Sequence, residues 1–237
     1  MIDILYIIGE PSINKDQELK YSLRSLEKYV SDFNRIFITG KCPDFIDKSK
    51  VIFTPEKDIG MSTVNHWWKV NQTITQTDIS EDFVLMYDDI FFIKPTKLEN
   101  YPFYQKGYLG ESTEGGKLYC QTLRNALEWL IRKRLPFVDY EVHTPFIYNK
   151  KNFLKLYDIF KAVADLNLRY GQLVPRSIYG NLFIKEEQPL IKDVKIRSKD
   201  EEIPTHLDCF SVSDLDFKYK TLEYLEQEFK NKSRWEK

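Results

Sequence analysis

The first hundred residues alternate between short apolar runs and segments whose apolar positions lie three or four residues apart. Continuous apolar runs are typical of strands that are buried on both faces of a sheet. They predict strands at residues 2–8, 35–39, 51–53 and 83–87, with residues 90–93 continuing in an extended conformation. Helical spacing is followed by Leu19, Leu23, Leu26 and Val30, and Ser62 is a candidate cap for a second helix that runs to about Thr75.

This β-α-β-β-α-β order predicts an α/β fold with a mostly parallel, doubly wound sheet flanked by helices. The second half has a less regular pattern. It predicts helices at 122–135, 152–166 and 219–229, short strands at 182–184 and 194–196, a loop at 100–118 and a frayed tail at 230–237. No internal repeat or interdomain linker interrupts the chain, so we expect a single domain over residues 1–237.

Composition narrows the functional classes. The chain has 35 Lys and Arg against 36 Asp and Glu, a net charge of −1, which is unlike a strongly basic nucleic-acid-binding protein. No run approaches the roughly 18 apolar residues that a membrane span needs. The apolar start, without a basic leader, is typical of a buried strand rather than a signal peptide. Cys42, Cys120 and Cys209 have unrelated spacings, which predicts neither a disulfide framework nor a zinc site and favours a cytoplasmic location.

The sharpest chemical feature is the pair Asp88-Asp89, directly after the predicted strand at 83–87. One interpretation is a turn, because Asp is common in turns. The other is a ligand site, because ligands of open α/β sheets bind outside the carboxyl ends of the strands, where carboxylates can hold Mg²⁺ or Mn²⁺. Strand-like sequence resumes at once at residue 90, and this favours the ligand site.

Residues 17–95 resemble the main conserved block of the Stealth-type sugar-phosphate transferases. The resemblance is carried, in the family's order, by the segments 18–29 (ELKYSLRSLEKY), 35–39 (RIFIT) and 83–95 (FVLMYDDIFFIKP). Weaker similarities lie at 141–145 (EVHTP), where the family has a His-x-Pro, and at 174–177 (VPRS), where it has an arginine. The family's usual first block, which ends in a Trp-Val-Asp-Gly-like turn, is replaced here by residues 7–11 (IIGEP).

The resemblance implies a fold similar to the GT-A glycosyltransferases, with a nucleotide-sugar-binding half at 1–100 and an acceptor half with a C-terminal helix at 101–237. It also implies that Asp88 and Asp89 hold Mn²⁺ or Mg²⁺ on the diphosphate of a nucleoside-diphosphate sugar, with Asp89 essential to catalysis. His206 is a candidate for a late metal ligand, although an ordinary loop histidine is the alternative. His143, in the His-x-Pro, is a candidate for the base that takes a proton from the acceptor.

Four further residues are candidate substrate contacts. Arg24, Lys69 and Arg176 would add positive charge around the diphosphate, and Asn65 would contact sugar or phosphate from the helix before the Asp-bearing strand. For Arg24, the structural alternatives are an ion pair with an acid across the sheet edge or a solvated helix charge; for Arg176, the alternative is a residue flanking a turn.

The expected activity is a metal-dependent transfer of a sugar, most simply UDP-linked, to a hydroxyl of a glycan or another polymer. One alternative is transfer of hexose-1-phosphate with release of UMP. A second is glycosylation of modified DNA bases, for which the basic segment Arg124 to Arg134 would meet the nucleic acid, although the net charge does not favour it. The third is a non-catalytic nucleotide-sugar-binding module.

Overall fold

The computed structural model spans residues 1–237 and describes all of them except 11–12, 61, 113–117, 166–172 and 187. A five-stranded sheet lies at its centre, in the order β3-β2-β1-β4-β6. Its strands are β1 (Ile2–Ile8), β2 (Phe33–Gly40), β3 (Ile52–Pro55), β4 (Asp82–Met86) and β6 (Phe146–Asn149). The first four are parallel, and β6 is antiparallel to β4. The predicted α/β fold with a mostly parallel sheet flanked by helices is therefore confirmed.

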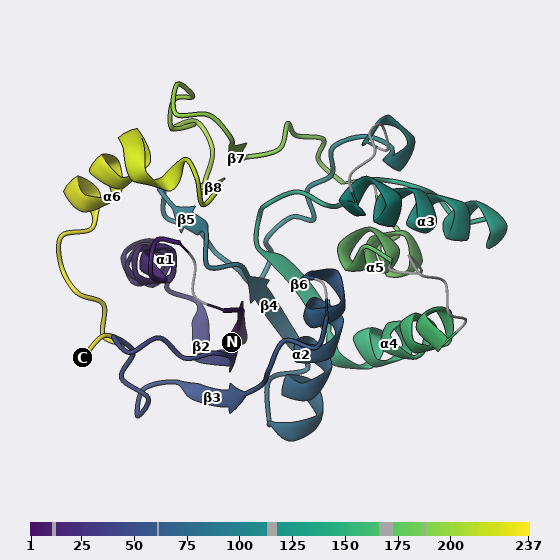
Figure 1. The fold of residues 1–237 in the computed structure, drawn as a ribbon, viewed down its shortest axis with the longest axis horizontal. Helices are drawn as coiled ribbons and strands as arrows, with labels where there is room; N and C mark the ends of the chain where they lie inside the picture. Colours follow the sequence, from purple (N-terminus) through teal and green to yellow (C-terminus); the bar gives the residue numbers. More distant parts are fainter. Residues whose placement is uncertain (11–12, 61, 113–117, 166–172, 187) are drawn as a thin grey trace.

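Each face of this sheet packs against helices, which explains why its strands are apolar throughout. Successive side chains of a strand point to opposite faces. Leu5 and Leu85 pack on the side of α2 (Ser62–Gln76) and α4 (Lys150–Asp165), and Ile4, Tyr6 and Val84 pack on the side of α1. Two more helices, α3 (Leu118–Arg132) and α5 (Pro175–Phe183), join the α2–α4 side (Figure 1), and a 3-10 turn spans Leu109–Ser112.

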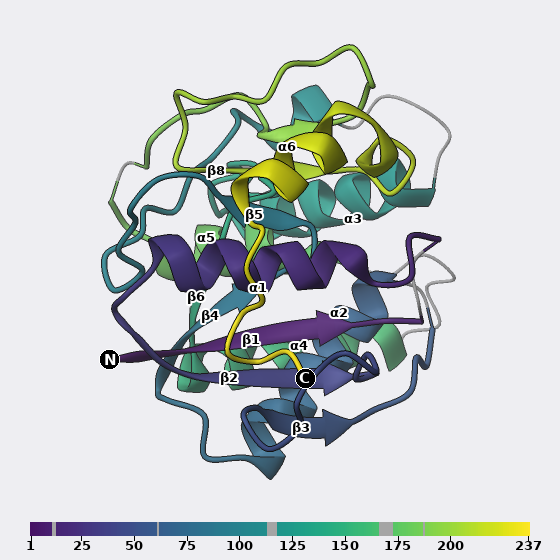
Figure 2. The same ribbon diagram turned by 90° about the vertical axis from the view of Figure 1, so that its left-hand side faces the viewer.

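Helix α1 (Gln17–Tyr29) lies between the large sheet and a second layer (Figure 2). That layer is a three-stranded sheet of β5 (Ile90–Phe92), β8 (Cys209–Val212) and β7 (Lys195–Ile196), with α6 (Leu222–Glu228) after a π-turn at Phe217–Thr221. The hydroxyl of Ser22 donates to the Ile90 carbonyl at 2.7 Å, and the Phe92 amide donates to Ser25 at 3.0 Å. These two hydrogen bonds pair backbone groups at the edge of β5 that no strand covers. Because α1 also packs against the large sheet, it connects the two sheets.

Two predictions for short apolar segments are wrong. The chain does turn at Asp88-Asp89, where the amide of Ile90 donates to the Tyr87 carbonyl at 3.3 Å, so β5 enters the second sheet instead of extending β4. Residues 182–183 end helix α5 rather than forming a strand. Both segments are apolar runs of three or four residues, too short for their pattern alone to identify their structure.

The C-terminal tail is packed rather than frayed. Trp235 is only 4% exposed, and its ring lies 5.9 Å from that of Phe33. Glu236 accepts hydrogen bonds of 2.8 and 2.7 Å from Nε and Nη2 of Arg24, which also donates to the Phe229 carbonyl. A bidentate pair with both side chains under 10% exposed anchors the tail against α1.

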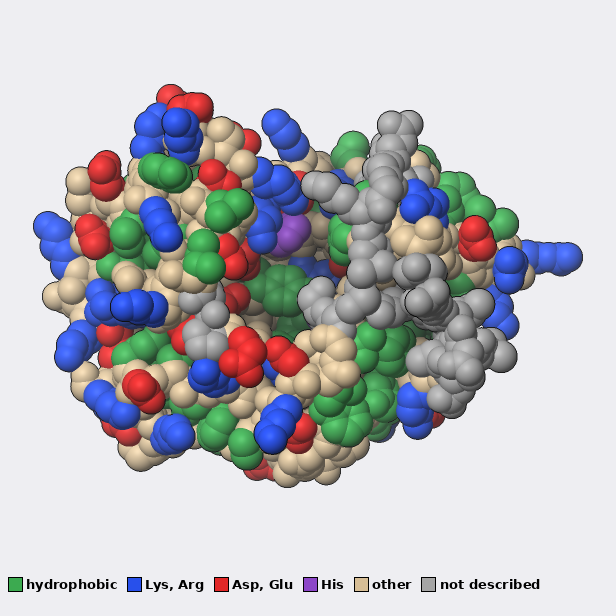
Figure 3. Space-filling model, viewed as in Figure 1, with side chains coloured by type: hydrophobic (Ala, Val, Ile, Leu, Met, Phe, Trp, Pro, Cys, Tyr) green, Lys and Arg blue, Asp and Glu red, His purple; other side chains and the backbone are tan. Residues whose placement is uncertain are grey.

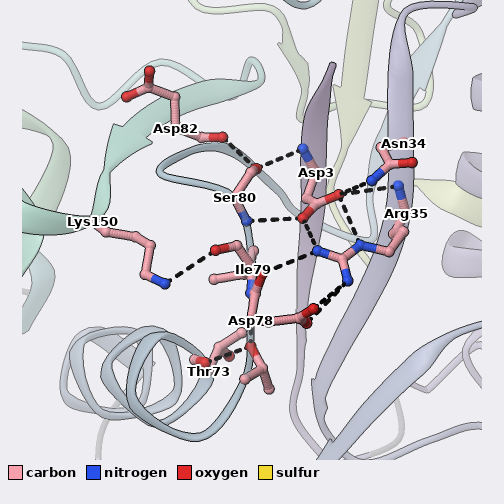
Figure 4. A network of polar contacts seen from close by, with 10 residues as sticks. Asp3, Asn34, Arg35, Thr73, Asp78, Ile79, Ser80, Asp82 and Lys150 are labelled. Carbon is pink, nitrogen blue, oxygen red and sulfur yellow. Dashed lines mark hydrogen bonds and ion pairs between the residues drawn. The ribbon is translucent and has the colours of Figure 1, made fainter.

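A second polar network ties the other end of the sheet (Figure 4). The carboxylate of Asp3, fully buried near the start of β1, accepts hydrogen bonds from the Ser80 amide and from both the amide and the guanidinium of Arg35. Arg35 in turn pairs with the exposed Asp78 at 2.8 Å. Because the network joins β1, β2 and the loop before β4 at their amino ends, it leaves the carboxyl ends free for a ligand.

Candidate functional site

The strand order places a cleft where an open α/β sheet is expected to bind a ligand. The chain moves from β1 outward to β2 and β3, and then returns to place β4 on the other side of β1. Ligands bind at such a reversal, outside the carboxyl ends of the strands. A cleft of about 650 Å³ lies there, lined by Ile7 and Gly9 at the end of β1 and by Tyr87, Asp88 and Asp89 after β4. Figure 3 shows a hollow in the middle of this face, with acidic, basic and histidine side chains around it.

Asp88 has a carboxylate with a strong preference for a proton or a cation. Burial raises its pKa to about 8, and the negative charges of Asp89, Glu18 and Asp214 add to the shift. In the part of the chain that the structure describes, no other side chain forms a hydrogen bond or ion pair with it. An unpaired carboxylate among like charges is destabilised when ionised, and a bound cation would relieve this.

Asp89 has the opposite surroundings. Its carboxylate accepts hydrogen bonds from the ammonium of Lys195 at 2.8 Å and from the hydroxyl of Ser211 at 3.0 Å. The pair links the β4–β5 turn to β7 and β8 and places a lysine at the cleft wall.

Arg176 contributes a positive charge beneath the cleft. It is 1% exposed, and Nη1 donates to the carbonyls of Val142 and Thr144. Nε and Nη2 have no hydrogen-bond partner among the described residues, and no carboxylate there lies within ion-pair distance. The guanidinium instead lies over the rings of Tyr87 and Phe146, at 4.6 and 5.4 Å. A buried cation without an ionic partner favours an anionic ligand nearby.

His143 and Asp193 form a carboxylate–imidazole pair at the cleft wall. Nδ1 of His143 lies 3.1 Å from both carboxylate oxygens of Asp193, which also accepts from Arg197 at 2.7 Å. Burial raises the pKa of Asp193, but the hydrogen bonds and charges of its partners outweigh burial and hold it far below the usual range. Burial, together with the positive charge of Lys195, lowers the pKa of His143 below its usual value, against the hydrogen bond and charge of Asp193, which raise it. Since the carboxylate only accepts, Nδ1 carries the hydrogen and the imidazole lone pair is on Nε2.

Two predicted contacts line the cleft but use their polar atoms within the protein. The ammonium of Lys69 donates to the Ile8 carbonyl at 2.8 Å and to Asp58 at 2.5 Å. The side-chain oxygen of Asn65 accepts from the amides of Ile59 and Gly60. Both residues therefore shape the 58–60 segment at the mouth of the cleft, and Lys69 also holds it to the end of β1.

Arg24 and His206 are placed away from the cleft. Arg24 is committed to Glu236 and the tail. His206 is exposed, and its carbonyl accepts from Lys94, at the end of β5 opposite to Asp89. Four extended residues span roughly 13 Å, so the structure does not bring His206 to the Asp pair.

Three charged residues of the site had no predicted role. Asp193, Lys195 and Arg197 alternate with apolar residues around β7, and their side chains meet His143, Asp89 and one another. The alternation (DVKIR) is itself a strand signal with one charged face, but only the strand at 194–196 was predicted from it. Glu141, whose pKa burial raises, also lines the cleft.

Comparisons with known proteins do not identify the chain. No family model matches it, and no curated protein does. Over the described residues, no three His, Cys, Asp or Glu side chains gather in a way that would enclose a metal ion. None of the helices described combines the length and apolarity that crossing a bilayer requires.

Proposed function

We propose that the protein is a GT-A-like glycosyltransferase that binds a nucleoside-diphosphate sugar, most simply UDP-linked, in the cleft beside β1 and β4. The observation that carries the proposal is the juxtaposition of Arg176, a buried cation without an ionic partner, and Asp88, an unpaired carboxylate, at the reversal of strand order. A diphosphate needs fixed positive charge, and a divalent cation that bridges carboxylate and phosphate supplies more of it.

The residues present fit a cation that is shared with the ligand. Mg²⁺ is commonly bound by one or two carboxylates together with substrate phosphates and water, rather than by a complete protein cage. Asp88 would hold Mg²⁺ or Mn²⁺, which when bound would offset charge on the departing diphosphate. Asp89 has a different role, because its carboxylate positions Lys195, whose ammonium adds a fixed positive charge to the cleft wall.

The His143–Asp193 pair supplies the proton acceptor. The hydroxyl of the acceptor, a glycan or another polymer, attacks the anomeric carbon, and its proton passes to Nε2 of His143. The bond between the anomeric carbon and the phosphate oxygen breaks, and the nucleoside diphosphate leaves with the bonding electrons. Asp193 keeps the hydrogen on Nδ1 and so presents the lone pair on Nε2.

Calorimetry with UDP, with and without Mn²⁺, tests donor binding. We expect Mn²⁺ to strengthen UDP binding to the protein, and Asp88→Asn to remove that gain while an exposed control, Asp200→Asn, keeps it. Loss of binding in Arg176→Lys would support the cation beneath the cleft. If UDP and the other nucleoside diphosphates all fail to bind with Mn²⁺ present, the proposal is wrong.

Product analysis separates the remaining activities. Released UDP indicates sugar transfer, whereas released UMP indicates transfer of hexose-1-phosphate. Binding without donor hydrolysis or transfer to any acceptor would leave a nucleotide-sugar-binding module. Activity only on duplex DNA would identify a nucleic-acid acceptor instead of a glycan.

A cytoplasmic location stays a prediction; the three cysteines form no disulfide bond with one another.

Asp193→Asn tests the proton acceptor. An amide can donate to Nδ1, which would move the imidazole hydrogen to Nε2, so we expect kcat to fall by about 10²–10⁴-fold with KM for the donor little changed. His143→Gln should lower kcat at least as much. A change of only a few-fold in both variants would exclude this pair as the base.

A further inference from the structure

The end of helix α3 carries an exposed surface of cationic and apolar side chains. Residues 132–134 (Arg-Lys-Arg) are all exposed. Ile131 and Phe137 are 55% and 39% exposed, and the ring of Tyr108, itself 55% exposed, lies 5.4 Å from the ring of Phe137. We call residues 131–137, together with Tyr108, the 131–137 patch. It belongs to the α3 side of the molecule, away from α1 and α6 (Figure 1).

The backbone of the patch includes one residue, Arg134, in a conformation that is unfavourable for its side chain. Arg134 has φ 56°, the left-handed conformation, while the amide of Leu135 donates back to the Leu130 carbonyl at 3.0 Å and closes the helix end. Glycine or asparagine is usual at this position because other side chains are crowded there. An arginine at a position that disfavours it suggests a role outside the fold.

The charge of the patch is largely uncompensated. Arg132 has one exposed partner, Glu128 at 3.6 Å, and Lys133 lies over the ring of Trp129 at 5.9 Å. Within the residues that the structure describes, Arg134 has no side-chain hydrogen bond or ion pair. The patch therefore combines a net positive charge with large apolar side chains that stay in water.

We infer that the 131–137 patch binds the surface of a membrane that contains anionic lipids. Cations are attracted to the negative headgroups, and exposed aliphatic and aromatic side chains gain by entering the boundary between headgroups and acyl chains. A nucleic acid would use the same cations, but it would gain little from Ile131. The inference concerns a partner of the whole protein and does not depend on the proposed transferase activity.

Residues 214–220 form another segment with exposed apolar and lysine side chains, but we do not expect it to bind the membrane surface. Leu215 and Tyr219 are 73% and 50% exposed, and their segment contains Lys218 and Lys220 but also Asp214 and Asp216. Its charges nearly cancel, so we expect it to have no attraction to anionic lipids. It is therefore a matched control for exposed apolar and lysine side chains without net charge.

Co-sedimentation of the full chain with lipid vesicles tests the inference. We expect the protein to bind vesicles of phosphatidylglycerol mixed with phosphatidylcholine, to bind pure phosphatidylcholine far less, and to be released as salt rises. Neutralising residues 132–134 to Gln should weaken binding about 100-fold, since each basic residue contributes roughly a five-fold factor. The paired change Ile131→Ser with Phe137→Ser should weaken it as well.

Two controls keep the result interpretable. Lys218→Gln with Leu215→Ser should leave vesicle binding unchanged. Arg134→Gly should raise the melting temperature, because glycine fits the left-handed position, and yet weaken vesicle binding; this combination cannot come from misfolding. The inference is overturned if the protein ignores anionic vesicles, if the control variant weakens binding as much as the patch variants do, or if duplex DNA binds the patch independently of Ile131 and Phe137.

Discussion

Asp88 and Asp89 are neighbours in sequence, but their surroundings give their carboxylates different chemistry. Asp89 is neutralised by Lys195 and Ser211, whereas Asp88 faces other acids and has a pKa near 8. A dipeptide in a sequence does not reveal this difference, because the compensating residues are more than a hundred positions away. Of the two carboxylates, Asp88 is therefore the one that a bound cation would stabilise more.

The raised pKa of Asp88 predicts a pH-dependent stability. Its pKa is about 8 in the folded protein against 3.8 for an ordinary aspartate, so the folded state holds the proton more tightly. The free energy of unfolding should therefore fall as pH rises between these values. Asp88→Asn removes this penalty. Between about pH 5 and pH 9, the free energy of unfolding of the variant should therefore rise by about 2 kcal/mol relative to that of the parent. This figure is smaller than the full pKa shift implies because water in the cleft screens the charge.

Urea unfolding at both pH values measures this gain. Asp200→Asn, an exposed aspartate, should show no pH-dependent difference from the parent. A difference between Asp88→Asn and the parent that stays constant with pH would contradict the shifted pKa.

Asp3 and Asp78 share the same arginine and yet should contribute very differently. Asp3 is fully buried and also accepts from backbone amides, so Asp3→Ala leaves those donors and part of Arg35 unpaired (Figure 4). We expect it to lower the free energy of unfolding by about 3–5 kcal/mol. Asp78→Ala, the matched exposed partner, should change stability little. Thermal melts of both variants measure the contrast, and equal effects would contradict it.

At the scale of elements, the structure commits Arg24 to an ion pair with an acid rather than to the cleft. It lies on α1, but its guanidinium holds the C-terminal tail through Glu236. Arg24→Met would leave Glu236 buried without its partner, and we expect unfolding to become easier by about 3 kcal/mol. The double variant Arg24→Met, Glu236→Leu should recover most of this loss.

Nucleotide binding distinguishes the two roles of Arg24. Calorimetry should show that UDP binds Arg24→Met as tightly as it binds the parent, because Arg24 does not line the cleft. Weaker UDP binding with unchanged stability would restore the predicted contact to phosphate.

The elements that the sequence predicts well are those whose own burial sets the spacing of their apolar residues. Strands β1, β2 and β4 each contain a run of consecutive apolar residues, and α1 and α2 repeat their apolar positions with helical spacing. The errors occur where partners decide the structure. Strand β8 exists by pairing with β5, and the tail is ordered by a residue 212 positions away. No local pattern carries such information.

At the scale of the whole molecule, the cleft lies between two layers, which the turn from β4 to β5 connects at the cleft itself. One wall belongs to the large sheet through β1 and β4, and the other belongs to the small sheet through Lys195 and Arg197. The contacts across it include the pairs of Lys195 with Asp89 and of Asp193 with His143, and the hydrogen bond from Ser211 to Asp89. Topology predicts the position of the cleft from the strand order, but these charged pairs depend on the tertiary structure.

This arrangement predicts that a ligand in the cleft stabilises β7, a two-residue strand that pairs with β8 at the edge of the small sheet. The amides of Ser211 and Ser213 donate to the carbonyls of Val194 and Ile196 and therefore report whether β7 is in place. We expect UDP with Mn²⁺ to slow hydrogen exchange at these two amides about ten-fold or more, because binding opposes the opening that exposes them.

The control for this measurement is β3, at the edge of the large sheet away from the cleft. Its amides should exchange at nearly the same rate with and without ligand if the effect is local to the cleft. Equal slowing in β3 and at Ser211 and Ser213 would mean that the ligand stabilises the fold as a whole. Slowing confined to the ends of β1 and β4 would mean that the ligand does not connect the two layers, and Lys195 would then have no part in binding it.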